Sequence, residues 1–412
     1  MDKGTQHTTA GQTGIDGKTA LEELLREGAR QMLQQAIEVE VAEYVDAHKS
    51  LLGEDGKRVV VRNGHGRERD ILTGVGPLAV RQPRVNDKRP GEKFTSSILP
   101  PFMRRVPSID ALIPCLYLKG ISTGDFGEAL EAILGPQAKG LSATNIVRLK
   151  ECWKHDYEAW RQQDLSDKHY VYIWVDGIHF NVRLDDERSC VLVIIGATQD
   201  GKKELLAVQD GYRESKLSWK EILRDLKARG LSQLPALATG DGALGFWAAA
   251  SEEFPETRRQ RCWVHKTANI LDKMPKSVQS KAKTRIHDMY MADTKKNALK
   301  AYDEFLALYE AKYPKACECL SKDKDDLFTF YDFPAEHWIH IRTTNPIEST
   351  FATVRLRTKR TKGCGSRTAT LTMVYKLVEQ AEKHWRKLNA HKLILKLIEG
   401  ATFTDGVLDM AA

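Results

Sequence analysis

The stretch between residues 170 and 241 constrains the fold most, because short β-branched and aromatic runs alternate there with one clear amphipathic helix. Three such runs predict a three-stranded meander, over residues 170–175, 178–184 and 190–197. A helix predicted over residues 218–229 and a further strand over residues 235–239 follow. Strands, then a helix, then a strand indicate a mixed α/β sheet.

Two aspartates stand where predicted strands end. Asp176 follows the first run and Asp241 follows the last, and a glycine comes after each. An Asp-Gly pair after a strand can simply be a turn, because Asp bonds its own backbone and Gly accepts a positive φ. A carboxylate at the end of a buried strand is destabilising, however, unless it is paired, hydrogen-bonded or metal-bound. Two such acids indicate a cation site.

A third acid, Glu348, opens a helix predicted over residues 344–359. Taken alone, it can be the N3 residue of a helix start in which Asn345 is the N-cap and Pro346 is N1. Together with Asp176 and Asp241 it supplies the oxygen ligands that Mg²⁺ prefers, with positions left for phosphate oxygens. Two ions held in this way support in-line phosphoryl transfer. We therefore expect these three acids to be the catalytic residues and the metal ligands of a Mg²⁺ centre, in which Mn²⁺ can substitute.

A basic, glycine-punctuated region over residues 57–93 predicts small β-hairpins, and a helix with an apolar stripe precedes it over residues 19–47. The region holds ten basic residues against four acidic ones. Such a charge run can be a solvated face, but this excess favours phosphate contact. The candidate DNA-binding residues here are Arg62, Arg67, Arg69, Arg81 and Arg84.

From residue 107 the pattern turns helical. Helices predicted over residues 109–118 and 123–134 are separated by a glycine-containing break, and Ser142 is a candidate N-cap for a third helix. This is the outline of a helix-turn-helix, although a plain three-helix bundle has the same outline. If the last helix enters a DNA groove, the residues that reach bases or phosphates are Thr144, Asn145, Arg148 and Lys150.

Helices also dominate the chain after the second aspartate. Residues 266–340 carry almost no strand signal, which predicts an all-helical insertion within the α/β domain. Helices predicted over residues 344–359 and 371–398 flank a run of six basic residues with no acidic one. The run would bind phosphates beside the third acid, with a solvated face as the alternative. Its members are Arg355, Arg357, Lys359, Arg360, Lys362 and Arg367.

Length and composition exclude several classes. A chain of 412 residues with 42% hydrophobic and 29% charged residues forms two to four globular domains rather than a disordered or fibrous protein. The polar start has no apolar signal region, and no apolar stretch could cross a bilayer, so we expect no export and no membrane role. Seven scattered cysteines suit a reducing cytoplasm. The absence of a G-x-x-x-x-G-K-[ST] loop argues against a nucleotide cofactor.

Six ordered motifs stand out over roughly residues 20–400: Asn63-Gly64-His65-Gly66-Arg67-Glu68-Arg69, Leu116-Tyr117-Leu118-Lys119-Gly120-Ile121-Ser122, Val175-Asp176-Gly177-Ile178-His179-Phe180, Gly240-Asp241-Gly242-Ala243, Arg261-Cys262-Trp263-Val264-His265-Lys266 and Arg342-Thr343-Thr344-Asn345-Pro346-Ile347-Glu348. Together they resemble the DDE transposases of bacterial insertion sequences, of the Mutator-like group.

The resemblance implies an RNase H-like catalytic domain whose metal-binding acids are Asp176, Asp241 and Glu348, with an all-helical insertion before the glutamate. It also places Arg355 at a basic position two helical turns after Glu348, where the two side chains share a helix face. The motifs that surround the acids add Lys266, Arg342 and Asn345 as candidate DNA contacts.

Cys262 and His265 form a Cys-x2-His pair with three readings. The pair can be half of a zinc site, although zinc needs four ligands and the nearest other cysteines, Cys317 and Cys319, are far along the chain. It can be a buried packing pair, or it can support the active site, which is the reading that the family motif favours. Trp263 between them is expected to be a core aromatic.

We expect a multidomain α/β plus α protein with six parts. These are a disordered start and N-terminal helix for dimerisation or DNA binding (1–50), a basic β-hairpin DNA-binding region (51–105), a helix-turn-helix-like helical domain (106–165), the first part of the RNase H-like catalytic domain (166–265), the all-helical insertion (266–340) and the last part of the catalytic domain with C-terminal helices (341–412).

The expected function is that of an insertion-sequence transposase. The chain would bind the terminal inverted repeats of its element in double-stranded DNA and catalyse Mg²⁺-dependent strand cleavage and strand transfer into target DNA by a two-metal mechanism. A homodimer in the bacterial cytoplasm, associated with the nucleoid, is expected, with the helices over residues 19–47 and 371–398 as candidate contacts. Two alternatives stay open: a catalytically silent DNA-binding regulator derived from a transposase, and a metal-dependent nuclease.

Overall fold

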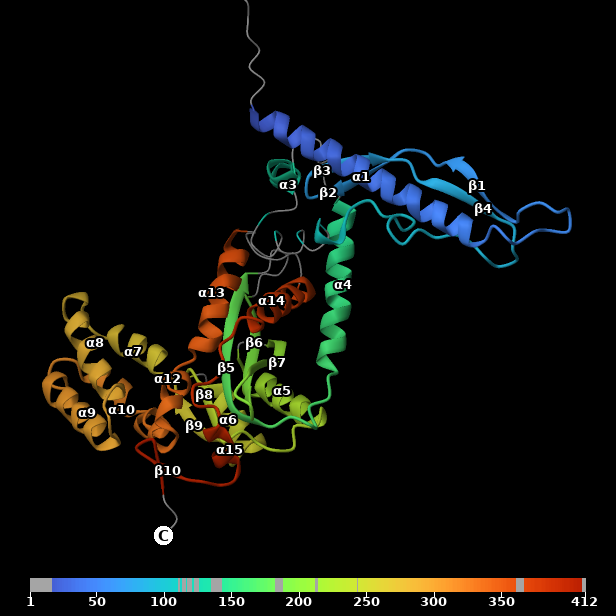
Figure 1. Cartoon of the computed structure of the whole chain (residues 1–412). Coiled ribbons are helices and arrows are strands. Elements are labelled where there is room, and N and C mark those ends of the chain that lie inside the picture. The colour runs from blue at the N-terminus through green and yellow to red at the C-terminus, as the bar shows by residue number, and fades with distance from the viewer. Residues whose placement is uncertain are drawn as a thin grey trace, which may run out of the picture. The chain divides into compact units, whose positions relative to one another are not determined.

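The computed structural model describes residues 17–109, 112, 116, 121, 126–134, 143–181, 188–211, 214–242, 244–360 and 367–409. Its contacts divide the chain into two compact units, Met1–Ile146 and Val147–Ala412, which are drawn together in Figure 1. Within the described ranges, no helix has the length and apolarity that a membrane span requires.

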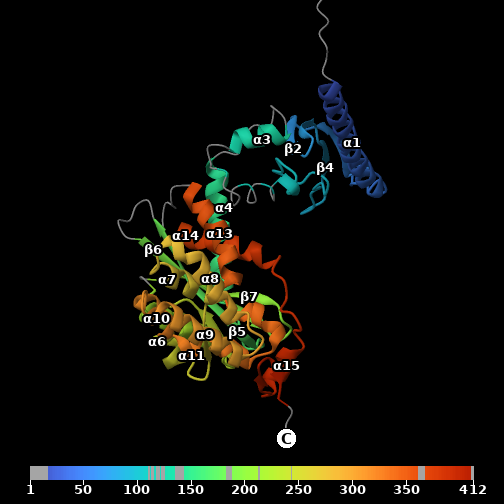
Figure 2. The same cartoon turned by 90° about the vertical axis from the view of Figure 1, so that its left-hand side faces the viewer.

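The first unit is built on a long helix and four short strands. Helix α1 (Gly17–Ala47) lies along strands β1 (Val60–His65), β3 (Gly76–Val80) and β4 (Pro83–Asp87). Figure 2 shows it beside β4. Strand β2 (Arg69–Thr73) forms a hairpin with β3, whereas β1 pairs with β4 across that hairpin. A small core of Ile37, Ile71, Val80 and Leu99 joins the helix to the strands. The hairpin prediction is therefore right for β2–β3, but β1 and β4 pair over a longer distance in the chain.

Two further helices are described near the end of the first unit. Helix α3 (Phe126–Leu134) corresponds to the second predicted helix of the helix-turn-helix outline, and α4 (Ala143–Arg161) corresponds to the third and runs past the division between the units. Most of the predicted first helix, the turn and Ser142 lie outside the described residues. The helix-turn-helix therefore stays a prediction.

The second unit contains a five-stranded mixed sheet in the order β7-β6-β5-β8-β9. Strands β5 (Tyr170–Asn181), β6 (Arg188–Thr198) and β7 (Lys203–Gly211) form an antiparallel meander, and β8 (Leu237–Gly240) and β9 (Arg258–Arg261) add to β5 in parallel. The mixed sheet and the meander are confirmed, but the meander's membership was predicted wrongly.

Asp176 and Gly177 do not form a turn. They lie inside β5, where Asp176 pairs with Val193 and the pairing with β6 continues to Asn181. The first two predicted strands are thus one long strand, and the third strand of the meander is β7. The local preference of Asp-Gly for a turn is outweighed by pairing, because the twelve residues of β5 pair with β6 along almost their whole length.

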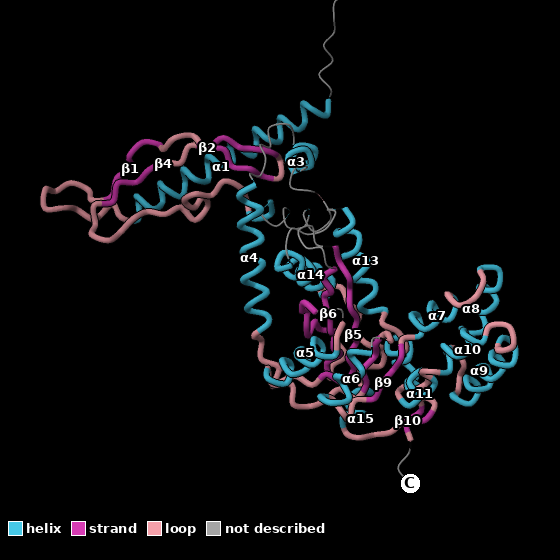
Figure 3. The backbone as a smooth tube through the Cα atoms, turned by 180° about the vertical axis from the view of Figure 1, so that it is seen from behind, coloured by secondary structure: helices cyan, strands magenta, loops and turns pink. Residues whose placement is uncertain are grey.

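Helices cover both faces of this sheet, as Figure 3 shows from behind. On one face, α5 (Lys216–Ala228) and α6 (Leu244–Glu253) pack Trp219 and Phe246 against Ile173 and Val175 of β5. On the other face, Tyr172 and Trp174 form hydrogen bonds to the segment before α13 (Asn345–Arg360). The Tyr172 hydroxyl is 2.8 Å from His337 Nδ1, and the Trp174 indole N–H donates to the His340 carbonyl at 2.9 Å. The alternation of β5 side chains thus separates the two helical layers.

Between β9 and α13 the described elements are helical. They are α7 (Trp263–Leu271), α8 (Lys276–Tyr290), α9 (Lys295–Tyr309), α10 (Pro314–Ser321), α11 (Lys324–Leu327), η1 (Thr329–Asp332), η2 (Ala335–His337) and α12 (Trp338–Ile341). In Figure 1 helices α7 to α10 gather at one side of the sheet. Trp263 is a core aromatic, as predicted: it is fully buried and donates to the Leu327 carbonyl at 2.8 Å.

The C-terminal region differs from its prediction. The helix expected over residues 371–398 is two helices, α14 (Arg367–Glu382) and α15 (Leu393–Ile398), followed by the short strands β10 (Phe403–Thr404) and β11 (Val407–Leu408). The connection is tied to the sheet, because Leu388 donates to the Gly201 carbonyl and Lys203 donates to the Arg386 carbonyl. These bonds hold the chain in a non-helical path between the two helices.

Candidate active site

Three parallel strands bring distant residues together at the point where β8 and β9 end beside the middle of β5. Val175 of β5 is in register with Gly240 of β8, and Gly240 is in register with Arg261 of β9. The residues that come next on each strand are Asp176, Asp241 and Cys262. The Cys262 backbone N–H still donates to the Gly240 carbonyl at 2.8 Å, which places Cys262 directly beside the start of the Asp241 loop.

Asp176 is the most deeply buried of the predicted acids. Its exposed fraction is 6%, and although Oδ1 accepts the Gly177 N–H at 2.9 Å, the buried Oδ2 has no hydrogen-bond partner. Burial, together with the Asp241 and Glu214 charges, raises the pKa of this carboxyl to about 7, although the His265 charge and the Gly177 N–H act in the opposite direction. A buried carboxylate oxygen without a partner fits a site that takes a cation.

Glu348 reaches the same region from the first turn of α13. Thr344 precedes that helix, and its carbonyl accepts the Ile347 and Glu348 N–H groups at 2.9 and 3.0 Å. Its hydroxyl donates to Glu348 Oε1 at 2.9 Å. Asn345 is therefore the first helical residue rather than the N-cap, Thr344 takes the capping position, and this threonine orients the glutamate.

Cys262 and His265 lie beside Glu348. The Thr344 N–H and hydroxyl are each 3.3 Å from Cys262 Sγ, and His265 Nδ1 is 3.7 Å from Glu348 Oε1. Possible ligand atoms of Cys262, His265 and Glu348 all lie within 4.8 Å of one another. The hydrogen bond to Cys262 raises the pKa of His265 to about 9; burial opposes this rise, and the charges of Asp176 and Glu348 support it. The imidazole is thus cationic at neutral pH.

Zinc is poorly supported at this pair. A structural zinc site takes four protein ligands, whereas this group has three members among the residues that the structure describes. The sulfur is fully buried and bonded to Thr344. The geometry instead supports both other interpretations of the Cys-x2-His pair, the packing pair and the active-site support. Cys262 packs in the core, whereas His265 faces the acids.

The sequence prediction missed one acid, Glu214. It lies in the loop between β7 and α5, and its Oε1 is 3.1 Å from His179 Nε2 and 3.9 Å from Cys190 Sγ. Burial raises the pKa of Glu214, and the Asp241 charge is the next largest cause. The signal that identified Asp176 and Asp241, an acid soon after a strand, also applies to Glu214, but β7 itself was not predicted.

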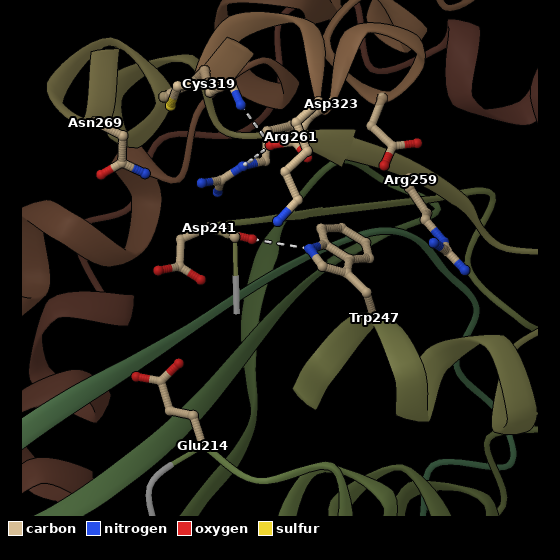
Figure 4. Close-up of a pocket in the computed structure, with 12 residues that line it drawn as sticks. Glu214, Asp241, Trp247, Arg259, Arg261, Asn269, Cys319 and Asp323 are labelled. Carbon is tan, nitrogen blue, oxygen red and sulfur yellow. Dashed lines mark hydrogen bonds and ion pairs between the residues drawn. The ribbon is translucent and has the colours of Figure 1, made fainter. Parts of the chain in front are cut away.

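A pocket of about 480 Å³ opens beside Asp241. Figure 4 shows Asp241 and Glu214 on one side of it and Arg261 and Asp323 on another. Lys266 also lines the pocket, yet its side chain is only 3% exposed and donates to Asp323 at 2.7 Å. This lysine is therefore a paired residue of the pocket wall, and its assignment to DNA stays a prediction.

The basic candidates of the first unit differ in their surroundings. Arg67 and Arg84 are exposed. Arg62 is paired with Glu38 at 2.6 Å and Arg81 with Glu68 at 3.1 Å. Arg69 is half-buried and donates to the Gln82 side chain and to backbone carbonyls, which makes it a structural residue of the small strands.

The basic candidates near Glu348 are similarly mixed. Arg342 is half-buried, donates to the Tyr290 carbonyl at 2.7 Å and lies over the Tyr290 ring, so it ties α8 to the segment before α13. Asn345 is exposed. Arg355 is exposed on α13, two turns after Glu348, and its guanidinium lies 5.9 Å from the Phe351 ring centre. Arg367 opens α14, where it is 3.7 Å from Asp210.

The other candidates have no described side chains. The backbones of Arg357, Lys359 and Arg360 lie in the last turns of α13, and those of Thr144, Asn145, Arg148 and Lys150 lie in the first turns of α4. Lys362 lies outside the described residues. Their assignment to DNA therefore stays a prediction.

Comparisons with known proteins give one consistent result. The model of the family "Transposase, Mutator family" matches residues 2–388. The transposase for insertion sequence element IS6120 of Mycolicibacterium smegmatis is 54% identical over 72% of this chain and 91% of its own length. That for IST2 of Acidithiobacillus ferrooxidans is 53% identical over 68% of this chain and 95% of its own. A solved structure, the Drosophila P element transposase strand transfer complex, aligns over 71% of this chain and 85% of its own at 12% identity and a TM-score of 0.29.

Proposed function

The chain belongs to the Mutator family of transposases, and from that premise we propose that it cuts and joins DNA at a centre built from Asp176, Asp241 and Glu348. Transposition of an insertion sequence is the function that it shares with its relatives. The site assignment rests on Asp176, whose buried Oδ2 has no hydrogen-bond partner among the described residues. Asp241 follows the end of the neighbouring strand β8.

The three acids fit a pair of Mg²⁺ ions. Each offers hard oxygen ligands, and each is held by a separate element, β5, the loop after β8, and the start of α13. Bound there, such ions would help to activate the attacking oxygen and to stabilise the leaving one. The protein's part is to hold the acids: Thr344 fixes the Glu348 carboxylate, and the parallel register of β5 and β8 sets the spacing of Asp176 and Asp241.

His265 has a role of its own in this proposal. Its raised pKa, about 9, keeps a proton on the ring at neutral pH between Asp176 and Glu348. Without DNA, this cation offsets part of the repulsion between the acids. With DNA bound, its N–H can donate to an oxygen of the scissile phosphate, a charge-assisted bond.

The fold supports an RNase H-like assignment for the second unit. Its antiparallel meander followed by parallel strands, with the acids at one sheet edge and an all-helical segment before the last acid, matches the plan expected for that class. We propose the six-part organisation on the same grounds, with the catalytic domain in residues 166–265 and 341–412 and the insertion in residues 266–340.

The proposal also assigns DNA contacts and a dimer. Exposed Arg67 and Arg84 of the first unit and exposed Arg355 beside Glu348 are the described residues best placed for phosphate contact. Leu21, Leu24 and Met32 of α1 are exposed apolar residues, which supports α1 as the dimer contact. Helix α14 is a weaker candidate, because its apolar residues are buried within the second unit.

A strand-joining assay tests the proposal. Purified protein is incubated with Mg²⁺ and labelled duplexes that carry the inverted repeat of its element, and wild type is compared with Asp176→Asn, Asp241→Asn and Glu348→Gln. We expect joined products from wild type alone, with DNA binding retained by all four proteins. Cutting without joining would indicate a nuclease, and binding without cutting under any divalent ion would indicate a regulator.

A further inference from the structure

We propose that Glu214 is a fourth carboxylate of this centre and that, with Asp241, it holds one of the two divalent ions, while Glu348 holds the other and Asp176 lies between them. The inference rests on the proposed function, because it extends the metal centre by one residue. It concerns an acid that no motif of the sequence singles out.

Glu214 is held rigidly at its position. It precedes Ser215, the N-cap of α5, whose side chain accepts the Ser218 N–H at 3.2 Å. The backbone of Glu214 and Ser215 packs so closely on Gly245 of α6 that a Cβ there would come within 3.0 Å of it. Glu214 itself has a φ of +50°, which is uncommon for a residue other than glycine. The fold therefore maintains a specific backbone geometry to present this side chain.

The side chain is directed along β5 to the catalytic edge. A Cβ added to Gly177 would lie closer than 3.0 Å to three atoms of the Glu214 side chain, so the missing side chain of Gly177 admits the carboxylate. Figure 4 shows the Glu214 carboxylate directed toward the Asp241 carboxylate, on the same side of the pocket. Both line the pocket of about 480 Å³. Glu214 thus shares this pocket wall with Asp241.

A second observation points to a ligand. Asp176, whose side chain is more than nine-tenths buried, keeps an oxygen without a partner among the described residues, and Asp241 and Glu214 are among the charges that act on it. On the Glu348 side, the cationic His265 offsets the acids. On the Glu214 side, His179 is 3.1 Å from Glu214, whereas Arg261 and Lys266 of the pocket wall are paired with Asp323. Three carboxylates in so small a space favour a divalent cation.

The ligand chemistry indicates a hard ion such as Mg²⁺ or Mn²⁺. Carboxylate oxygens are the atoms that Glu214, Asp241 and Asp176 offer. His179 and Cys190 also have possible ligand atoms within 4.8 Å of one on Glu214. A softer ion would use that imidazole and sulfur instead. A carboxylate site would bind Mn²⁺, whereas a site that uses the imidazole and the sulfur would prefer Zn²⁺, so titration with both ions distinguishes them.

The test is calorimetric titration of the full chain with Mn²⁺, in the absence and in the presence of a duplex that carries the inverted repeat. Glu214→Gln keeps the shape of the side chain and removes its charge, and Glu221→Gln, at an exposed position of α5, is the matched control. We expect wild type and the control to bind two Mn²⁺ ions and Glu214→Gln to lose one of them or bind it at least tenfold more weakly. Melting temperature and far-ultraviolet circular dichroism check that each variant folds.

Gly177→Ala provides a second, independent variant. Its new methyl group must displace the Glu214 carboxylate, so we expect the same loss of one Mn²⁺ with Glu214 itself unchanged. Unaltered Mn²⁺ binding by Glu214→Gln, while Glu348→Gln loses an ion, would overturn the inference and leave the proposed function intact. Wild type that binds no Mn²⁺ with or without the duplex would overturn both. Tight Zn²⁺ binding that needs Cys190 and competes out Mn²⁺ would replace the hard-ion site with a soft one.

Discussion

At the scale of single residues, the proposed centre combines a buried carboxyl group with neighbouring acids. Asp176 is buried beside two other acids and has one hydrogen bond, to its neighbour's backbone. Such a residue weakens the metal-free fold and is stabilised when a cation arrives. His265 partly offsets the charge in the meantime, because its raised pKa keeps it protonated. Function thus accounts for an arrangement that stability alone would not favour.

Asp176→Asn should stabilise the metal-free protein at alkaline pH. The folded-state pKa of Asp176, about 7, lies above its ordinary value of 3.8. Its favourable contribution is therefore complete below about pH 4 and is lost as the pH rises through about 7. We expect the variant to gain on the order of 2–4 kcal/mol over wild type at pH 8.5 in EDTA and almost nothing at pH 4. Urea unfolding at the two pH values measures this, and an equal difference at both would contradict it.

At the scale of elements, the site depends on how strands and helices begin and end. Strands β5, β8 and β9 align Asp176, Asp241 and Cys262, and the N-terminal turn of α13 adds Glu348. Thr344 connects these pieces, because its hydroxyl donates to Glu348 and lies 3.3 Å from Cys262 Sγ. One side chain thereby sets the position of the third acid relative to the core.

Thr344→Val should impair the centre without unfolding the chain. Valine keeps the volume and removes the hydroxyl that orients Glu348. We expect strand joining to fall roughly 10- to 100-fold, as is usual when a residue that orients a metal ligand is lost. Thr353→Val, at an exposed position of α13, is the control, and this variant should join strands at the wild-type rate. If the two variants behaved alike, Thr344 would have no part in positioning the glutamate.

Most residues of the proposed centre can be predicted from the sequence alone, for identifiable reasons. Asp176, Asp241 and Glu348 lie in short motifs next to strongly patterned strands or helices, so local signals suffice to find them. Glu214 follows a strand whose pattern is weak, and it reaches the site only because Gly177, 37 residues earlier, leaves room. The burial of Lys266 depends on Asp323, 57 residues later. Such long-range pairings carry no local pattern.

At the scale of the whole molecule, the chain consists of two units that carry different groups of functional candidates. The first presents exposed arginines and an exposed apolar helix face, and the second holds the acids and the pocket. The acids are separated by 65 and 107 residues in sequence, with an entirely helical segment in the longer interval. In the proposed function, these residues, far apart along the chain, form one metal centre.

Iron-mediated self-cleavage tests that claim most directly. Fe²⁺ takes the place of Mg²⁺, and with ascorbate and peroxide it generates radicals that cut the nearby backbone, so the fragments of an end-labelled chain map the site without any need for DNA joining. We predict cuts near residues 176, 241 and 348 together, all suppressed by excess Mg²⁺ and all lost in Asp176→Asn. Cuts at only one of these positions, or cuts elsewhere that Mg²⁺ does not suppress, would contradict a shared three-carboxylate centre.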